Sequence, residues 1–294
     1  MPTEMTELMH RVRRIRIATG RKVDERFCGA YRSVFRGRGI EFDAVRPYVP
    51  GDDVRGIDWN VTARMGHPYV KRYVEERELT VLFAVDISGS QRFGSAEKTK
   101  SELCAEVTAL LSLSAVRNQD RVGLVLFSDR IEHYLPARKG RRAVMRLVRD
   151  VLAAGETLRP TAIREALGFL NRVQRRRAVV FLISDFRDDA YETDLRLTAH
   201  HHDLVCCVVA DPRENELAPA GLIDTIDPES GRRLLLDTDA RRLRRRYARD
   251  AQRRREALWA TLRRCGVDAV ALDTTRPFVE DFRRLFERRR ARRR

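Results

Sequence analysis

From residue 79 onward, short apolar runs of strand length alternate with longer segments whose apolar residues recur at helical spacing. A strand covered on both faces is apolar almost throughout, whereas a covering helix is apolar along one stripe. We therefore predict an α/β fold with a doubly wound, mostly parallel sheet. The predicted strands span residues 79–85, 121–127, 178–183, 204–209 and 267–272, with 131–135 as an antiparallel edge strand.

Helical spacing of apolar residues defines the segments between these strands. Residues 95–117 place Leu103, Val107 and Leu110 on one face, and residues 239–264 form a long basic helix with a sparse apolar stripe. The other predicted helices span residues 3–17, 141–152, 162–173 and 192–201.

Residues 26–77 follow a different pattern, in which glycines and prolines interrupt short apolar runs such as residues 68–74. Such punctuation is typical of strands joined by turns. We therefore predict two parts. Residues 1–78 form an N-terminal helix and a small β-rich extension, and residues 79–294 form the α/β domain with its basic C-terminal helices.

The composition excludes several classes of protein. With 43% hydrophobic and 35% charged residues the chain is globular, and it has no run of about 20 apolar residues that could span a membrane. Arginines interrupt residues 1–20, where a signal peptide would have an apolar core. We therefore expect a cytoplasmic protein with no membrane span.

The net charge of +16 comes mostly from the C-terminal region, since residues 231–294 include 22 basic and 9 acidic side chains. A basic region of this kind attracts nucleic acid or an acidic protein. Few aromatic residues lie among these arginines. Nucleic-acid binding is therefore an alternative and not the main expectation.

Candidate metal ligands follow the first predicted strand of the α/β domain. Asp86, Ser88 and Ser90 form a D-x-S-x-S pattern directly after the apolar run 81–85. Ligands of open α/β sheets bind at the carboxyl ends of the strands, which is where this pattern falls. A carboxylate and two hydroxyls are hard oxygen donors, suited to Mg²⁺, Mn²⁺ or Ca²⁺.

Two further oxygen donors are predicted at the same edge of the sheet. Thr161 precedes the helix 162–173, and Asp185 follows the strand 178–183. Thr157 is an alternative to Thr161. Each of these residues also has an ordinary structural use, as a helix N-cap or a turn residue. Their convergence, and not any one of them, indicates a site for a divalent cation.

This arrangement resembles the metal-ion-dependent adhesion site of von Willebrand factor A-type domains. The resemblance covers residues 79–285, and Thr161 follows Pro160 where such domains usually have glycine. It implies a divalent cation, with Mg²⁺ as the expected ion, and one coordination position left for an acidic side chain of a partner. Gln91 stands where these domains often have methionine, a change that we expect to leave coordination untouched. The implied ligands are Asp86, Ser88, Ser90, Thr161 and Asp185.

A second resemblance covers the N-terminal extension. Residues 36–42 (RGRGIEF), residues 46–59 (RPYVPGDDVRGIDW) and the pair Ala63-Arg64 are closely similar to the hallmark of the bacterial family called domain of unknown function 58. Members join this hallmark to a von Willebrand factor A-like domain, and many have transmembrane helices ahead of it. They are commonly encoded beside MoxR-type AAA+ ATPases. The resemblance implies a version without those helices, acting as a partner or adaptor of such an ATPase in chaperone-like assembly or metal insertion.

Within this hallmark, residues 50–53 predict a turn that exposes two carboxylates. Trp59 is expected to anchor the loop by burying its indole. We expect a structural network of ion pairs here and not direct catalysis. Its expected members are Arg46, Arg55 and Arg64 with Asp52, Asp53 or Asp58.

Together these features favour a metal-dependent protein-binding module without turnover, so we expect no enzyme. The sequence has no G-x-x-x-x-G-K-[ST] phosphate loop and no G-x-S-x-G nucleophile motif, which argues against an NTPase and a serine hydrolase. Two alternatives stay open. One is a metal-dependent hydrolase, because a bound divalent ion can activate water, and the other is nucleic-acid binding through the basic C-terminal region.

Overall fold

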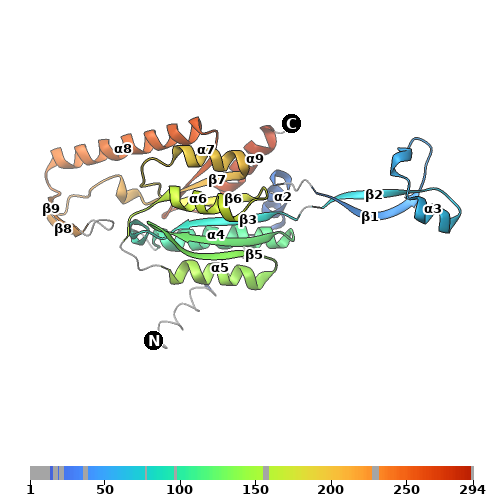
Figure 1. The fold of residues 1–294 in the computed structure, drawn as a ribbon. Helices are drawn as coiled ribbons and strands as arrows, with labels where there is room; N and C mark the ends of the chain where they lie inside the picture. The colour runs from blue at the N-terminus through green and yellow to red at the C-terminus, as the bar shows by residue number, and fades with distance from the viewer. Residues whose placement is uncertain are drawn as a thin grey trace, which may run out of the picture. The chain divides into compact units, whose positions relative to one another are not determined.

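The structure is a computed structural model of the chain. It describes residues 14–15, 19, 23–35, 39–76, 78–95, 98–154, 159–226 and 232–292, with only the backbone at 39–43 and 72–76. The predicted helix 3–17 therefore lies almost wholly outside the described residues. The chain folds as two units (Figure 1), a smaller one of residues Arg36–Leu79 and a larger one that contains the described residues on either side of it.

A six-stranded sheet forms the centre of the larger unit, in the spatial order β10-β7-β6-β3-β4-β5. All neighbouring strands are parallel except β4 and β5, which are antiparallel. The predicted mostly parallel sheet and its antiparallel edge strand are thus confirmed. The strands are β3 Thr80–Asp86, β4 Arg121–Phe127, β5 Ile131–Arg138, β6 Val179–Ser184, β7 Asp203–Ala210 and β10 Asp268–Asp273.

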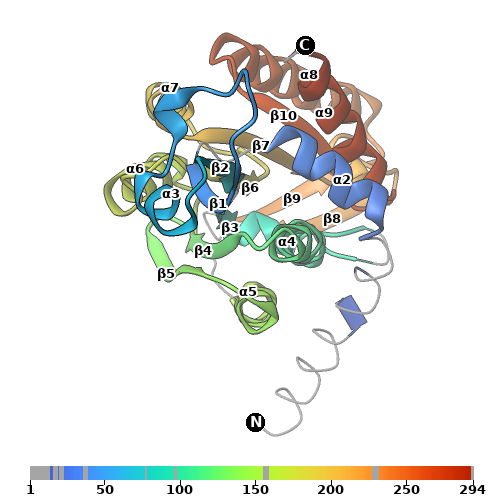
Figure 2. The ribbon, with the colours of Figure 1, turned by 90° about the vertical axis from the view of Figure 1, so that its right-hand side faces the viewer.

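Helices flank both faces of this sheet. Figure 2 shows α6 and α7 on one side and α2 and α4 on the other. The predicted helices match the observed ones within a few residues, but α4 begins at Lys100, because Thr99 and Glu102 form a reciprocal capping box there. The helices of this unit are α2 Glu25–Val34, α4 Lys100–Arg117, α5 Arg141–Ala153, α6 Ile163–Val173, α7 Glu192–His201, α8 Arg241–Arg264 and α9 Val279–Arg292.

Helix α2 corrects the predicted division of the chain. We expected residues 26–77 to be β-rich, but Phe27 and Tyr31 of α2 and its C-cap residue Phe35 recur every four residues and pack on Phe286 of α9, with ring centroids 5.5–6.1 Å apart. Phe35 also lies 5.8 Å from Phe181 of β6. The residues before Arg36 therefore belong to the larger unit. The N-terminal part, which we predicted as residues 1–78, is a separate unit only from Arg36 onward.

The smaller unit is a two-stranded antiparallel ribbon with a helical loop. Strands β1 Gly39–Pro47 and β2 Tyr69–Glu76 flank η1 Val54–Gly56 and α3 Trp59–Met65. Asp58 caps α3 by accepting from the backbone of Asn60 and Val61, and Gly66 ends the helix in the left-handed conformation. Residues 39–47 and 69–76 are thus the strands of the predicted β-rich extension.

Two expectations for this hallmark need correction. Trp59 is 69% exposed at the start of α3 and anchors nothing. The predicted ion-pair network shrinks to one bidentate pair, in which Arg46 donates to both oxygens of Asp52 at 2.6 Å. Asp52 is therefore bonded and not exposed, while Arg55 and Arg64 form no ion pair with the aspartates of the predicted network.

A second, exposed hairpin follows β7 in the larger unit. It consists of β8 Leu222–Ile226 and β9 Arg233–Asp237, paired antiparallel, and η3 Pro212–Glu214 precedes it. No helix in the described parts of the chain is long and apolar enough to cross a membrane.

The α2 stripe gives a first testable prediction. Replacing Phe35, which is 2% exposed, by alanine should lower the free energy of unfolding by about 3–5 kcal/mol, because the cavity left in the core cannot fully collapse. Trp59→Ala is the matched control and should change it by less than about 0.5 kcal/mol. Urea denaturation followed by circular dichroism measures both. Equal effects would contradict the assignment of α2 to the core.

Candidate functional site

The candidate site lies where three neighbouring strands end. β3 is flanked by β4 and β6, with Asp86 paired opposite Phe127 and Val85 opposite Ile183. The residues that follow β3 and β6 therefore emerge side by side at the carboxyl edge of the sheet, as parallel strands require.

Around the carboxylate of Asp86, hydroxyl groups converge from three segments. The Asp86 side chain is 1% exposed, and its Oδ2 accepts a 2.6 Å hydrogen bond from the Ser184 hydroxyl. Thr161 Oγ1 lies 3.3 Å from the same oxygen and 2.9 Å from Ser88 Oγ. Ser88 Oγ lies 3.1 Å from Ser90 Oγ. The hydroxyls of the D-x-S-x-S pattern and of Thr161 thus form one buried cluster.

Backbone hydrogen bonds hold Thr161 in this position. The N–H of Gly89 donates to the carbonyl of Arg159 at 3.0 Å, and the N–H of Ala162 donates to the carbonyl of Ser128 at 2.8 Å. The segment before α6 is therefore tied to the ends of both β3 and β4. The structure brings all five predicted residues, Asp86, Ser88, Ser90, Thr161 and Asp185, to one edge of the sheet, whereas Thr157 lies outside the described residues.

The two carboxylates of the site have opposite electrostatic environments. Burial, followed by repulsion from Asp185, raises the pKa of Asp86 to about 6, although hydrogen bonds from Ser184 and Ser88 oppose the shift. Burial alone would also raise the pKa of Asp185. The ammonium of Lys100 outweighs it and lowers the pKa of Asp185, so that this carboxylate keeps its charge.

Lys100 is the functional residue that our sequence reasoning missed. Its side chain is fully buried, and its Nζ donates to Asp185 Oδ2 and to Glu214 Oε1, each at 2.7 Å. Burial lowers the pKa of Lys100, but the two carboxylates outweigh burial and raise it. No local pattern marks Lys100 or Glu214, which are 114 residues apart. Ser184 was missed as well, although it directly precedes the predicted residue Asp185.

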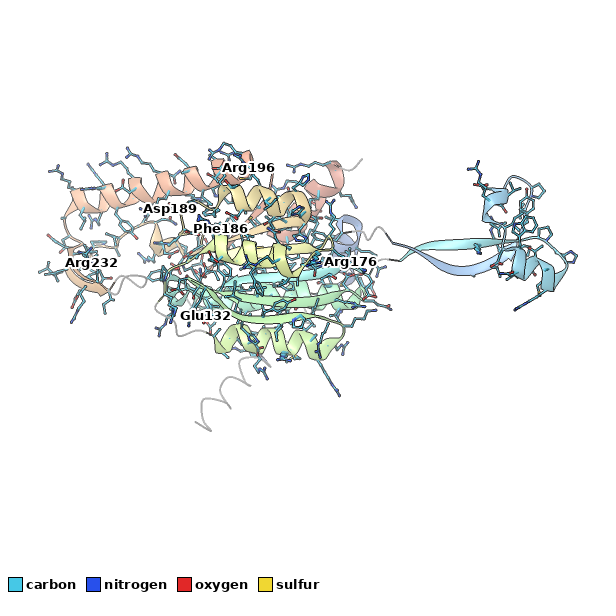
Figure 3. The ribbon with its side chains drawn as sticks, viewed as in Figure 1. Glu132, Arg176, Phe186, Asp189, Arg196 and Arg232 are labelled. Atoms are coloured by element: carbon cyan, nitrogen blue, oxygen red, sulfur yellow. The ribbon has the colours of Figure 1, made fainter. Side chains whose placement is uncertain are left out.

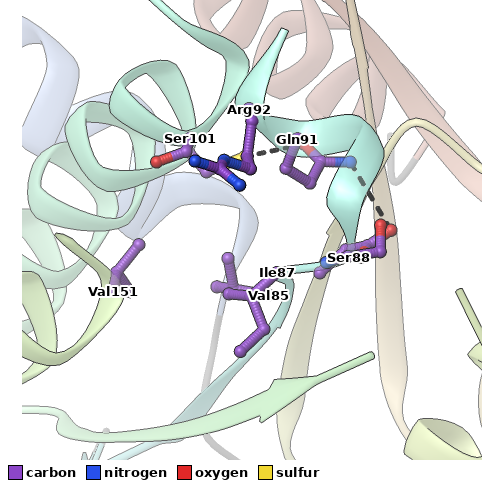
Figure 4. Close-up of a pocket in the computed structure, with 9 residues that line it drawn as sticks. Val85, Ile87, Ser88, Gln91, Arg92, Ser101 and Val151 are labelled. Atoms are coloured by element: carbon purple, nitrogen blue, oxygen red, sulfur yellow. Dashed lines mark hydrogen bonds between the residues drawn. The ribbon is translucent and has the colours of Figure 1, made fainter. Parts of the chain in front are cut away.

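Gln91, which we expect to leave metal coordination untouched, contacts the Asp86 side chain. Its Nε2 lies 3.5 Å from Asp86 Oδ2, and its Oε1 lies 3.7 Å from the Cys104 sulfur (Figure 4). Gln91, Ser88 and Val151 also line a cavity of about 10 Å³ beneath the loop. That volume is at the lower limit for one water molecule. Gln91 therefore adds a weak polar contact to the Asp86 carboxylate.

The backbone directly after Asp185 is strained. Phe186 has φ +58°, a left-handed conformation that a bulky residue rarely adopts, while its N–H donates to Ser184 Oγ at 2.9 Å. Such strain costs on the order of 1–2 kcal/mol and clusters at functional sites. The tight turn brings Ser184 and Asp185 into the same polar cluster.

The donor set fits a divalent cation in both chemistry and spacing. Oxygen ligands at right angles around Mg²⁺ lie about 2.9 Å apart, and around Ca²⁺ about 3.3–3.7 Å apart. Ser88 Oγ lies 2.9 Å from Thr161 Oγ1 and 3.1 Å from Ser90 Oγ. These distances also suit hydrogen bonds between hydroxyls, so they fit the ion without requiring it. Among the described residues, no three His, Cys, Asp or Glu side chains form a metal-binding group.

Fold and site together define a mixed α/β protein with a central, mostly parallel six-stranded sheet, flanked by helices and bearing a buried polar cluster at its carboxyl edge. The family model described as "Protein of unknown function DUF58" matches residues 44–257. The chain belongs to this family, as its N-terminal hallmark predicted.

The curated relatives are themselves uncharacterized. The "Uncharacterized protein Rv1480" of Mycobacterium tuberculosis is 32% identical over 286 residues, covering 95% of this chain and 89% of that protein. An uncharacterized protein of Mycobacterium avium is 31% identical over 161 residues, covering 53% of this chain and 94% of that protein.

Solved structures give more distant likenesses. The conserved hypothetical protein BatB of Bacteroides thetaiotaomicron matches with a TM-score of 0.47 and 16% identity, over 72% of this chain and 98% of that one. An aerotolerance-related membrane protein of Bacteroides fragilis matches with a TM-score of 0.46 and 13% identity, over 73% and 99%. At TM-scores below 0.5, neither likeness carries an argument about this chain.

The buried ammonium gives the second prediction. Lys100→Met should lower the free energy of unfolding in chelator by about 3–5 kcal/mol, because Asp185 and Glu214 lose their buried partner. Lys98→Met is the matched control. Lys98 pairs with Glu106 at 3.2 Å in a partly exposed position, and its loss should cost about 1 kcal/mol or less. Urea denaturation in EDTA measures both, and similar losses for the two variants would contradict a structural role for the buried pair.

Proposed function

We propose that the chain is a metal-dependent protein-binding module of the von Willebrand factor A type. The observation behind the proposal is the buried cluster in which Ser88, Ser90 and Thr161 present their hydroxyls beside the carboxylate of Asp86. The carboxylate of Asp86 is enclosed beside three hydroxyls, so water stabilises its charge only slightly, whereas a bound cation would stabilise it strongly. A divalent ion held there offers a remaining coordination position to a carboxylate of a partner.

Each residue has a distinct part in this proposal. Asp86 supplies negative charge at the centre of the cluster, while Ser88, Ser90 and Thr161 supply neutral oxygens. Asp185 is already bonded to Lys100 at 2.7 Å, so we infer that it acts on the ion through water and through its charge. Because hydroxyls and one direct carboxylate neutralise the ion only partly, an acidic group of a partner is attracted to it.

We expect Mg²⁺ in preference to Ca²⁺, with Mn²⁺ as an equivalent. The hydroxyl spacings of 2.9 and 3.1 Å are close to the ligand spacing of a small octahedral ion. The function that follows is binding without turnover. A site built from hydroxyls and two carboxylates fits that role, since the residues lining its cavity and the adjoining groove include no histidine to act as a base.

The partner we propose is a MoxR-type AAA+ ATPase. Membership in the DUF58 family supports it, because the N-terminal hallmark of this chain resembles that of proteins commonly encoded beside such ATPases. The role would be that of an adaptor in chaperone-like assembly or metal insertion, in which the divalent ion bridges the two proteins.

Metal binding is the third prediction. Asp86→Ala should weaken Mg²⁺ and Mn²⁺ binding at least about tenfold in titration calorimetry, because only neutral hydroxyls and a water-mediated carboxylate remain to replace the ion's hydration. Asp189→Ala, which removes an exposed carboxylate that follows β6, is the control and should bind like the unchanged protein. The metal assignment fails if Asp86→Ala and the unchanged protein bind the ions equally.

The bridging ion gives the fourth prediction. A purified MoxR-type ATPase should bind the immobilised protein in Mg²⁺, and its affinity should fall at least about tenfold in EDTA or with Asp86→Ala, since the shared ion supplies a central contact. Surface plasmon resonance measures this, with Glu287→Ala, which removes an exposed carboxylate of α9, as control. Binding that is unchanged by EDTA would refute an ion-bridged interface.

A further inference from the structure

The face of α8 that points toward the sheet has an unusual composition. Tyr247, Ala251, Arg254, Arg255 and Leu258 follow the spacing i, i+4, i+7, i+8 and i+11, which places them on one side of the helix. All five line a single groove. A face turned toward the body of a protein is normally apolar, so two adjacent arginines there call for an explanation.

The groove connects α8 with the candidate metal site. It has a volume of about 780 Å³, within the range of about 300–1,000 Å³ typical of ligand sites, and its opposite wall follows the ends of β6, β7 and β10. Figure 1 shows α8 running along this side of the sheet, and Figure 3 labels Phe186 and Asp189 on the opposite wall. Ser90, Asp185 and Glu214 also line the groove, so a ligand in it would reach the polar cluster.

Two of the arginines that line this groove, both on α8, have no acidic partner among the described residues. Neither Arg254 nor Arg255 forms an ion pair within the described parts of the chain, whereas Arg264 of the same helix pairs with Glu192 at 3.1 Å. Both side chains belong to exposed residues beside an open groove. They are therefore available to bind carboxylates from outside the chain.

The opposite wall is acidic, but most of its charge is already engaged. Only the exposed Asp189 lacks a side-chain partner among the six acidic residues of the groove. An acidic ligand would be repelled from this wall unless a divalent cation offsets its charge, and it would be attracted to α8. The other five carboxylates accept hydrogen bonds, some of them from charged side chains: Asp185, Asp188, Glu192, Glu214 and Asp273.

Aromatic side chains favour a polypeptide as the occupant. Tyr247 and Trp259 line the groove beside Arg254 and Arg255. Tyrosine, tryptophan and arginine are the residues that most often dominate the binding energy of protein interfaces. A small inorganic anion would not bury the aromatic surface of Tyr247 and Trp259.

We infer that this groove is the docking site for an acidic segment of a protein partner. One carboxylate of the segment reaches the ion at Asp86, and further carboxylates bind Arg254 and Arg255. The inference rests on the proposed function for the first contact, whereas the contacts to α8 are independent of it.

A matched pair of charge reversals tests this inference. The probe is a fluorescein-labelled peptide in which glutamate alternates with serine, compared with the same peptide containing glutamine, and fluorescence anisotropy in Mg²⁺ measures binding. Arg254→Glu with Arg255→Glu should weaken binding of the glutamate peptide at least about tenfold. The control, Arg249→Glu with Arg253→Glu, makes the same change of net charge on the other side of α8, outside the groove, and should weaken it less than about twofold.

The outcomes separate this inference from the metal proposal. Equal binding of the glutamate and glutamine peptides, or equal weakening by the two double variants, overturns the docking site whatever the metal does. Binding that depends on Arg254 and Arg255 but persists in EDTA and in Asp86→Ala supports the docking site and removes the metal from it. A single-stranded oligonucleotide that competes with the peptide and binds more tightly through the same arginines would overturn the peptide assignment in favour of nucleic acid.

Discussion

A buried carboxylate at the end of a central strand is the constraint around which the larger unit is organised. Asp86 is 1% exposed, and its oxygens are satisfied because the backbone N–H of Ser88 and the hydroxyls of Thr161 and Ser184 converge on them. Those residues come from three parts of the sequence. They meet because β3 lies between β4 and β6 in a parallel arrangement, so the sheet order and the polar cluster depend on one another.

Lys100 resolves the conflict that two neighbouring carboxylates would otherwise create. Like charges so close together in a low-dielectric environment cannot both ionise without compensation. The ammonium stabilises the charge of Asp185 and Glu214, while Asp86, which lacks a cationic partner among the described residues, has its pKa raised to about 6. In this site the negative charge of Asp185 is therefore balanced by Lys100, whereas that of Asp86 has no cationic side chain beside it among the described residues.

The sequence predicted the periodic elements well and the irregular contacts poorly. Apolar runs in the sequence located five strands of the sheet and the edge at which the D-x-S-x-S pattern lies, because buried strands consist almost entirely of apolar residues. Helix α2 was missed because its glycine and its position beside a turn-rich segment masked the Phe27, Tyr31 and Phe35 stripe. Trp59 was misplaced because local sequence does not say whether a tertiary pocket exists for it. Lys100 was missed because its partners are distant in the chain.

The ribbon of the smaller unit has a consequence for how such chains vary. Its first and last described strand residues, Gly39 and Glu76, are paired, so the chain leaves the larger unit and returns to it through adjacent strands. Removing one residue pair from β1 and β2 would move every side chain beyond the deletion to the opposite face of the ribbon, whereas removing two pairs restores the alternation. In natural relatives, each strand of this ribbon should therefore gain or lose residues in even numbers, while the larger unit stays unchanged.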